Sequence, residues 1–96
     1  MLMDDLLNFL QTLSVEEVQD AIGNGDTILD MLDRRMPLWR IIYRFSNNGI
    51  DKKQLTPENL LNELNKFRPD LVRLVRSDKN NFMWYLNQVD LIKKTL

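Results

Sequence analysis

The sequence contains no cysteine and no histidine. The lack of cysteine excludes disulfide bonds and thiolate metal sites, and the lack of histidine removes the commonest general base and the commonest metal ligand. The three glycines fit no phosphate-binding pattern, because two of them flank Asn24 and the third follows Asn48, as in helix stops. We therefore expect no cofactor, no bound metal ion and no catalytic residue, and we classify the chain as a non-enzyme.

Long apolar runs are also missing, since none approaches the roughly 18 residues that a membrane span needs. The N-terminal stretch MLMDDLLNFL carries acidic instead of basic residues, unlike a secretory signal. We expect a soluble, intracellular protein, placed in the cytoplasm, without a membrane partner. A chain of 96 residues is long enough for one core that buries about 60–65% of the unfolded surface.

Basic residues are absent from the first third of the chain. Residues 1–33 contain eight Asp or Glu and no Lys or Arg, whereas residues 34–96 contain thirteen basic and six acidic residues. The net charge of −1 therefore hides an acidic N-terminal third and a basic remainder. If folding places the two charges on opposite sides, one molecule can dock on another copy or on a relative of matching polarity.

These two charged regions supply candidate partner-binding residues. The acidic patch comprises Asp4, Asp5, Glu16, Glu17 and Asp20. The basic patch comprises Arg34, Arg35, Arg40, Arg44, Arg73 and Arg76. Nucleic-acid binding through the arginines is an alternative, which the sequence pI of about 5.3 disfavours. A second alternative is a solvated surface with internal pairs such as Asp30 with Arg34.

Apolar residues recur at helical spacing along the chain, and no useful strand-like alternation occurs. We therefore predict an all-α fold, with residues 1–96 forming one compact domain of six or seven short helices. Pro37 lacks an N–H group and disfavours helical backbone at Met36, so we predict a break or sharp kink at these two residues. A new helix is expected from Pro37 to near Ser46.

Helix starts are marked by capping residues. Ser14 and Glu17 have the spacing of a capping box, and Asp26 or Thr27 can cap the next helix. Thr56 precedes Pro57, and Leu55 is placed to fold back on Leu60 as a hydrophobic staple. Further helices are expected over residues 70–76 and from 79 to about 94, the last capped by Ser77 or Asp78. The buried side of the helix after Thr56 is predicted to comprise Leu60, Leu61, Leu64 and Phe67.

The last predicted helix has apolar residues on two sides. Phe82, Tyr85, Leu86, Val89 and Ile92 share one face. Trp84 and Leu91 lie on the opposite face, and Met83 lies between the two. Either this helix is central and covered on both sides, or Met83, Trp84 and Leu91 form a groove that receives a partner.

A specific pattern of apolar positions lies within residues 60–87. It comprises Leu60, Leu61, Leu64, Pro69, Leu71, Val72, Val75, Phe82, Leu86 and Asn87. This pattern resembles the second half of the XPC-binding domain of ubiquitin-shuttle DNA-repair proteins, a relative of helical repeats in stress-inducible co-chaperones. The family usually has Asn at the place of Arg68. The resemblance implies a groove that takes an amphipathic helix from a partner protein, and it brings no catalytic or cofactor residue.

The chain loosely resembles death-fold modules, the death-effector and caspase-recruitment domains, in its order of short helices and in its charge split. That likeness implies homotypic docking. The sequence thus predicts a non-catalytic protein–protein interaction module that binds a partner helix in an apolar groove or docks through acidic and basic patches, with self-association included. The alternatives are a nucleic-acid-binding or regulatory protein and a homotypic adaptor.

Overall fold

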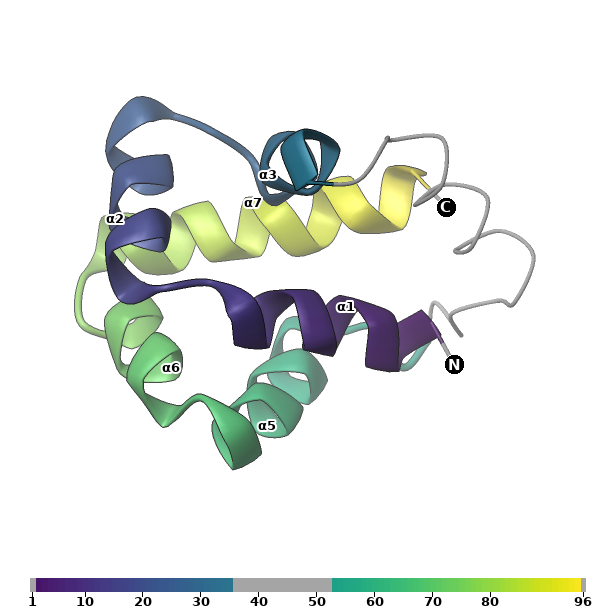
Figure 1. Ribbon diagram of the computed structural model, residues 1–96. Coiled ribbons are helices and arrows are strands. Elements are labelled where there is room, and N and C mark those ends of the chain that lie inside the picture. Colours follow the sequence, from purple (N-terminus) through teal and green to yellow (C-terminus); the bar gives the residue numbers. More distant parts are fainter. Residues whose placement is uncertain (1, 36–52, 96) are drawn as a thin grey trace.

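The computed structural model describes residues 2–35 and 53–95, with side chains from Leu6 to Lys94 within these ranges. These residues form helices and no strand (Figure 1). The helices are α1 (Leu2–Thr12), α2 (Val15–Asn24), α3 (Ile28–Arg35), α5 (Pro57–Phe67), α6 (Pro69–Arg76) and α7 (Lys79–Thr95). The predicted all-α fold is confirmed. The predicted break at Met36 and Pro37, and the helix expected after it, lie outside the described residues.

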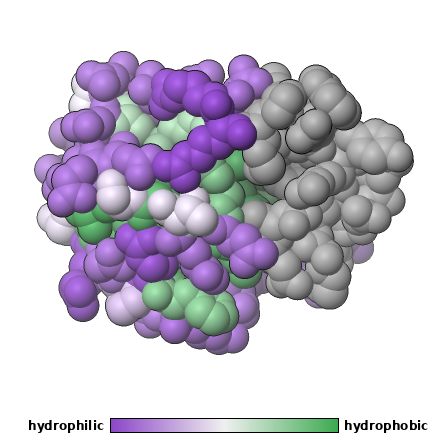
Figure 2. Space-filling model, in the orientation of Figure 1, coloured by the Kyte–Doolittle hydropathy of each residue, from purple (hydrophilic) through white to green (hydrophobic). Residues whose placement is uncertain are grey.

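The longest described helix, α7, is the centre of the arrangement. Helices α3, α5 and α6 pack against it, while α1 packs against α5 and α2 packs against α6 (Figure 1). Helices α2 and α6 lie at one end of the molecule, opposite the end where α1 begins and α7 finishes. In the same orientation the surface over α2 and α6 is mostly hydrophilic (Figure 2).

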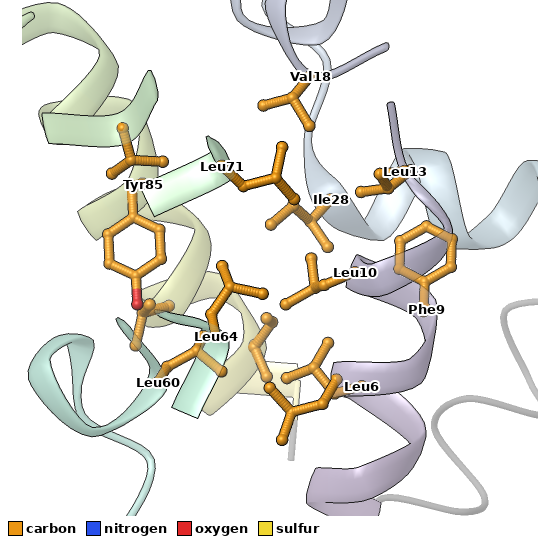
Figure 3. Packing of buried hydrophobic residues seen from close by; sticks show 14 of the residues in the cluster. Leu6, Phe9, Leu10, Leu13, Val18, Ile28, Leu60, Leu64, Leu71 and Tyr85 are labelled. Atoms are coloured by element: carbon orange, nitrogen blue, oxygen red, sulfur yellow. The ribbon is translucent and has the colours of Figure 1, made fainter. Parts of the chain in front are cut away.

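One apolar core receives side chains from every described helix. Leu10 of α1, Ile28 of α3, Leu64 of α5 and Leu71 of α6 point toward a common centre (Figure 3). The buried apolar residues are Leu6, Leu7, Phe9, Leu10, Leu13, Val18, Ala21, Ile28, Met31, Leu32, Leu55, Leu60, Leu61, Leu64, Leu71, Val72, Val75, Tyr85, Val89 and Ile92. Their spacing of three and four residues within each helix accounts for the burial of one side of that helix.

Helix α2 has defined caps at both ends. The Ser14 hydroxyl accepts a hydrogen bond from the Glu17 N–H at 3.1 Å, and the Glu17 carboxylate accepts one from the Ser14 N–H at 3.3 Å. The predicted capping box is therefore confirmed. At the other end Gly25 has φ 74°, and the Asp26 N–H donates to the Ala21 carbonyl at 2.8 Å. This Schellman ending turns the chain sharply toward α3.

The other helix starts follow the same local chemistry. Thr27, one of the two predicted caps of α3, accepts the Asp30 N–H at 3.0 Å. The Thr56 hydroxyl accepts the Asn59 N–H at 3.2 Å, and Leu55 is fully buried as expected for a staple. At α7 the cap is Asp78, whose carboxylate accepts the Asn80 N–H at 2.7 Å.

The prediction that Phe67 lies on the buried side of α5 is wrong. Phe67 is 55% exposed, although it lies on the same helical face as Leu60 and Leu64. It is the last residue of α5, and the chain turns at Arg68 directly into α6, which begins at Pro69. The apolar stripe of α5 therefore extends beyond the helices that cover it. Figure 2 shows an apolar patch over α5 in the lower part of the view.

Candidate protein-interaction surfaces

Helix α7 holds the start of α3 with two polar side chains. The Trp84 indole N–H donates to the Asp26 carbonyl at 2.9 Å. Gln88 accepts the Ile28 N–H at 2.9 Å and donates to the Trp84 carbonyl at 3.1 Å. Gln88 is only 3% exposed, so its amide satisfies an N–H group that the first turn of α3 leaves without an intrahelical partner.

The three predicted groove residues lie in different environments. Trp84 is half-buried and packs against the core, while its indole N–H is bonded to the chain before α3. Leu91 is half-buried, and Met83 is 48% exposed. Because α3, α5 and α6 all pack against α7, this arrangement favours a central helix over an open groove. Of the three residues, Met83 alone presents a largely accessible side chain.

Arg35 ties three helices together at the end of α3. Its guanidinium donates to the Thr12 hydroxyl at 2.8 Å and to the Glu17 carboxylate, and it lies 5.5 Å from the centre of the Phe9 ring. The pKa of Glu17 is lowered first by the hydrogen bond from the Ser14 backbone and also by Arg35. Glu17 of the predicted acidic patch and Arg35 of the predicted basic patch thus form an ion pair with each other within one molecule.

Arg34 also pairs with the acidic third of the chain. Its guanidinium lies 3.5 Å from the Asp26 carboxylate. The expected ion pair of Arg34 with Asp30 is replaced by this contact. The pKa of Asp30 is lowered first by the hydrogen bond from the Thr27 backbone, with a smaller contribution from the charge of Arg34. Arg34 and Arg35 therefore join the acidic and basic parts of the sequence in the fold.

Arg68 is the most extensively bonded cation among the described residues. It donates to both carboxylate oxygens of Asp70, at 3.0 and 2.9 Å, and to the carbonyls of Gln11 and Leu13, at 2.7 and 2.6 Å. Helix C-termini favour a positive charge, because their last carbonyls have no intrahelical partner. Arg68 thereby links the end of α1 to the start of α6, a structural role that the sequence analysis did not identify.

Three predicted patch residues are exposed and have no ion-pair partner within the described part of the chain. They are Glu16 and Asp20 on α2 and Arg73 on α6. Arg76, also exposed on α6, lies 3.8 Å from the Glu58 carboxylate. We call these four side chains, Glu16, Asp20, Arg73 and Arg76, the α2/α6 surface. The side chains of Asp4 and Asp5, and Arg40 and Arg44 entirely, lie outside the described residues.

The two helices that carry the α2/α6 surface are neighbours. Helices α2 and α6 pack against each other at the same end of the molecule (Figure 1). The charge split in the sequence allowed acidic and basic patches on opposite sides, whereas for these four residues the fold brings the acidic helix beside the basic helix. A patch that carries both signs side by side can complement a copy of itself.

No protein-family model, curated protein or solved structure matches this chain significantly. The resemblances to the XPC-binding domain and to death-fold modules stay predictions. Within residues 2–35 and 53–95, no helix combines the length and the apolar character needed to cross a membrane. The same residues contain no group of three or more acidic side chains arranged to hold a metal ion.

Proposed function

We propose that this chain is a non-catalytic protein–protein interaction module, and that it docks on its partner through the α2/α6 surface. One observation carries the proposal. Glu16 and Asp20 on α2, and Arg73 on α6, are exposed charges that form no ion pair with any described residue, and their two helices pack together. Elsewhere the described polar side chains form many hydrogen bonds that cap helices or join them, as Gln88 and Arg68 do.

Charge docking fits these residues better than phosphate binding. Arg73 and Arg76 supply positive charge for a nucleic-acid backbone, but the carboxylates of Glu16 and Asp20 lie on the adjacent helix. They would repel phosphates that approach α6. A protein surface with both signs of charge meets no such conflict, because each sign can face its opposite.

Capture of a partner helix is the second candidate, and the exposure of Met83 favours it. Met83 is 48% exposed on α7 beside the half-buried Trp84. A methionine adapts its shape to different apolar surfaces and is common at such binding sites. The half-burial of Trp84 and Leu91 leaves Met83 as the main accessible apolar anchor on this side of α7. We rank this mode second.

The experiment is selection of binding peptides from a displayed random library on the immobilised protein at low salt. Enriched peptides are then measured against two exposed-site variants, Arg73→Glu and Met83→Lys. We expect charged peptides that lose binding to Arg73→Glu and keep it to Met83→Lys. The opposite pattern favours helix capture. Failure to enrich any peptide that distinguishes the protein from an unrelated helical domain contradicts the interaction function.

A further inference from the structure

We infer that the partner of the α2/α6 surface is a second copy of this chain, related by a two-fold axis that sets α2 of each copy against α6 of the other. This inference rests on the proposed function and adds the identity of the partner. It follows from the order of charge on two neighbouring helices, acidic on α2 and basic on α6.

The acidic half of the surface, Glu16 and Asp20, forms no ion pair with the described residues. Glu16 and Asp20 are one helical turn apart on the exposed side of α2, so their carboxylates repel each other. Neither forms an ion pair with α6 of its own molecule, although α2 and α6 are in contact. Both carboxylates are therefore accessible to positive charges of a docking partner.

The basic half is similarly available. Arg73 is exposed and has no ion-pair partner in the described residues. Arg76 is 53% exposed, and its 3.8 Å separation from Glu58 is at the outer limit of an ion pair. Because the Glu58 side chain is itself 71% exposed, Arg76 can leave this contact with little loss of energy and face another carboxylate.

Acidic and basic charges on neighbouring helices are compatible with a closed pair. Acidic and basic surfaces on opposite sides of a molecule would produce head-to-tail assemblies, which grow unless a rotation closes them. On neighbouring helices, a two-fold rotation exchanges the two surfaces and satisfies both contacts in one step. The assembly then stops at two copies. Since exposed ion pairs dominate the contact, raising the salt concentration from about 50 to 500 mM should weaken it by roughly tenfold or more.

Charge reversal with mixing tests the arrangement. The acidic variant carries Glu16→Lys with Asp20→Lys, and the basic variant carries Arg73→Glu with Arg76→Glu. Each is examined by sedimentation equilibrium at low salt and high protein concentration, after circular dichroism confirms native helix content. We expect the unchanged chain to reach twice the 11.4 kDa monomer mass and each variant alone to be monomeric. An equimolar mixture should restore the dimer, because both contacts in the mixed pair join opposite charges.

Asn62→Lys with Asn65→Lys, on the exposed side of α5, is the matched control, and it should dimerise like the unchanged chain. The inference is overturned if the unchanged chain is monomeric, if mixing restores nothing, or if the mass grows beyond two copies. These failures are distinguishable from failure of the proposed function. If selected peptides still require Arg73 while the chain stays monomeric, the surface binds a foreign protein and the interaction function stands.

Discussion

Replacement of Arg68 by Ala should destabilise the fold more than loss of any exposed ion pair described above. The Arg68 side chain is only 19% exposed, and it donates four hydrogen bonds, two to Asp70 and two to backbone carbonyls at the end of α1. The Asp70 side chain is 39% exposed, so solvent screening limits that pair to about 0.5–1 kcal/mol. The two charge-assisted bonds to the carbonyls of Gln11 and Leu13 account for most of the remainder. We expect a total loss of about 2–4 kcal/mol.

A double-mutant cycle separates the two contributions. Urea denaturation followed by circular dichroism gives the free energy of unfolding for Arg68→Ala, Asp70→Ala and the double variant. We expect Asp70→Ala alone to cost about 0.5–1 kcal/mol, and Arg68→Ala to remain strongly destabilising when Asp70 is already absent. Equal losses for the two single variants, with no further loss in the double variant, would refute the link between Arg68 and α1.

The same pair predicts an acid dependence. Arg68 is the main cause that lowers the pKa of Asp70 from 3.8 to about 2. Because the folded pKa lies below the unfolded pKa, the pair stabilises the fold fully above about pH 4 and loses this effect as the pH falls toward 2. Asp70→Asn should therefore flatten the fall in stability over this range. An unchanged acid profile in Asp70→Asn would contradict the pairing.

Three further predictions concern local structure. No atom lies within 4 Å of a Cβ added at Gly23 or Gly25. Gly25→Ala should nevertheless cost about 1 kcal/mol, because Gly25 has φ 74°, whereas Gly23→Ala inside α2 should stabilise the fold by about 0.5–1 kcal/mol. Thermal unfolding compares the two variants, and effects of equal sign would be inconsistent with the cap. Gln88→Met keeps the volume but leaves the Ile28 N–H unpaired, so urea denaturation should show a loss of about 1–3 kcal/mol, and a loss below 0.5 kcal/mol would argue against the contact. Phe67→Ala should change stability by less than about 1 kcal/mol, because the ring is 55% exposed; a loss typical of a core phenylalanine, about 3–5 kcal/mol, would show that it is buried.

Local signals predicted the helices well. Ser14 with Glu17, Thr56 with Pro57, and Asp78 each act through neighbours within three residues, so their roles are readable from spacing alone. The apolar stripes likewise predicted most of the core. The predicted burial of Phe67 was wrong, because periodicity identifies the apolar face of a helix but not how far a neighbouring helix covers that face.

The candidate surfaces depended on contacts between distant residues, which spacing does not reveal. Gln88 contacts Ile28 across 60 residues of sequence, and Arg68 reaches Gln11 across 57. These contacts are decided by how α3 and α1 pack on the other helices. The charge split was visible in the sequence, but the sequence did not show which charged side chains stay available for docking. Some of them form ion pairs within the molecule, as Arg35 does with Glu17. Packing also places α2 beside α6, which changes the expected mode of docking.

The most direct test of docking through α2 and α6 uses a single spin label. The chain has no cysteine, so Gln19→Cys places one nitroxide on the exposed side of α2 without side reactions. This labelled copy is mixed at low salt with an unlabelled copy enriched in ¹⁵N, and paramagnetic broadening is measured in the second copy. We predict broadening of the α6 amides from Arg73 to Arg76, and its disappearance at high salt. Absence of broadening, or broadening confined to α5 around Phe67, would contradict the account.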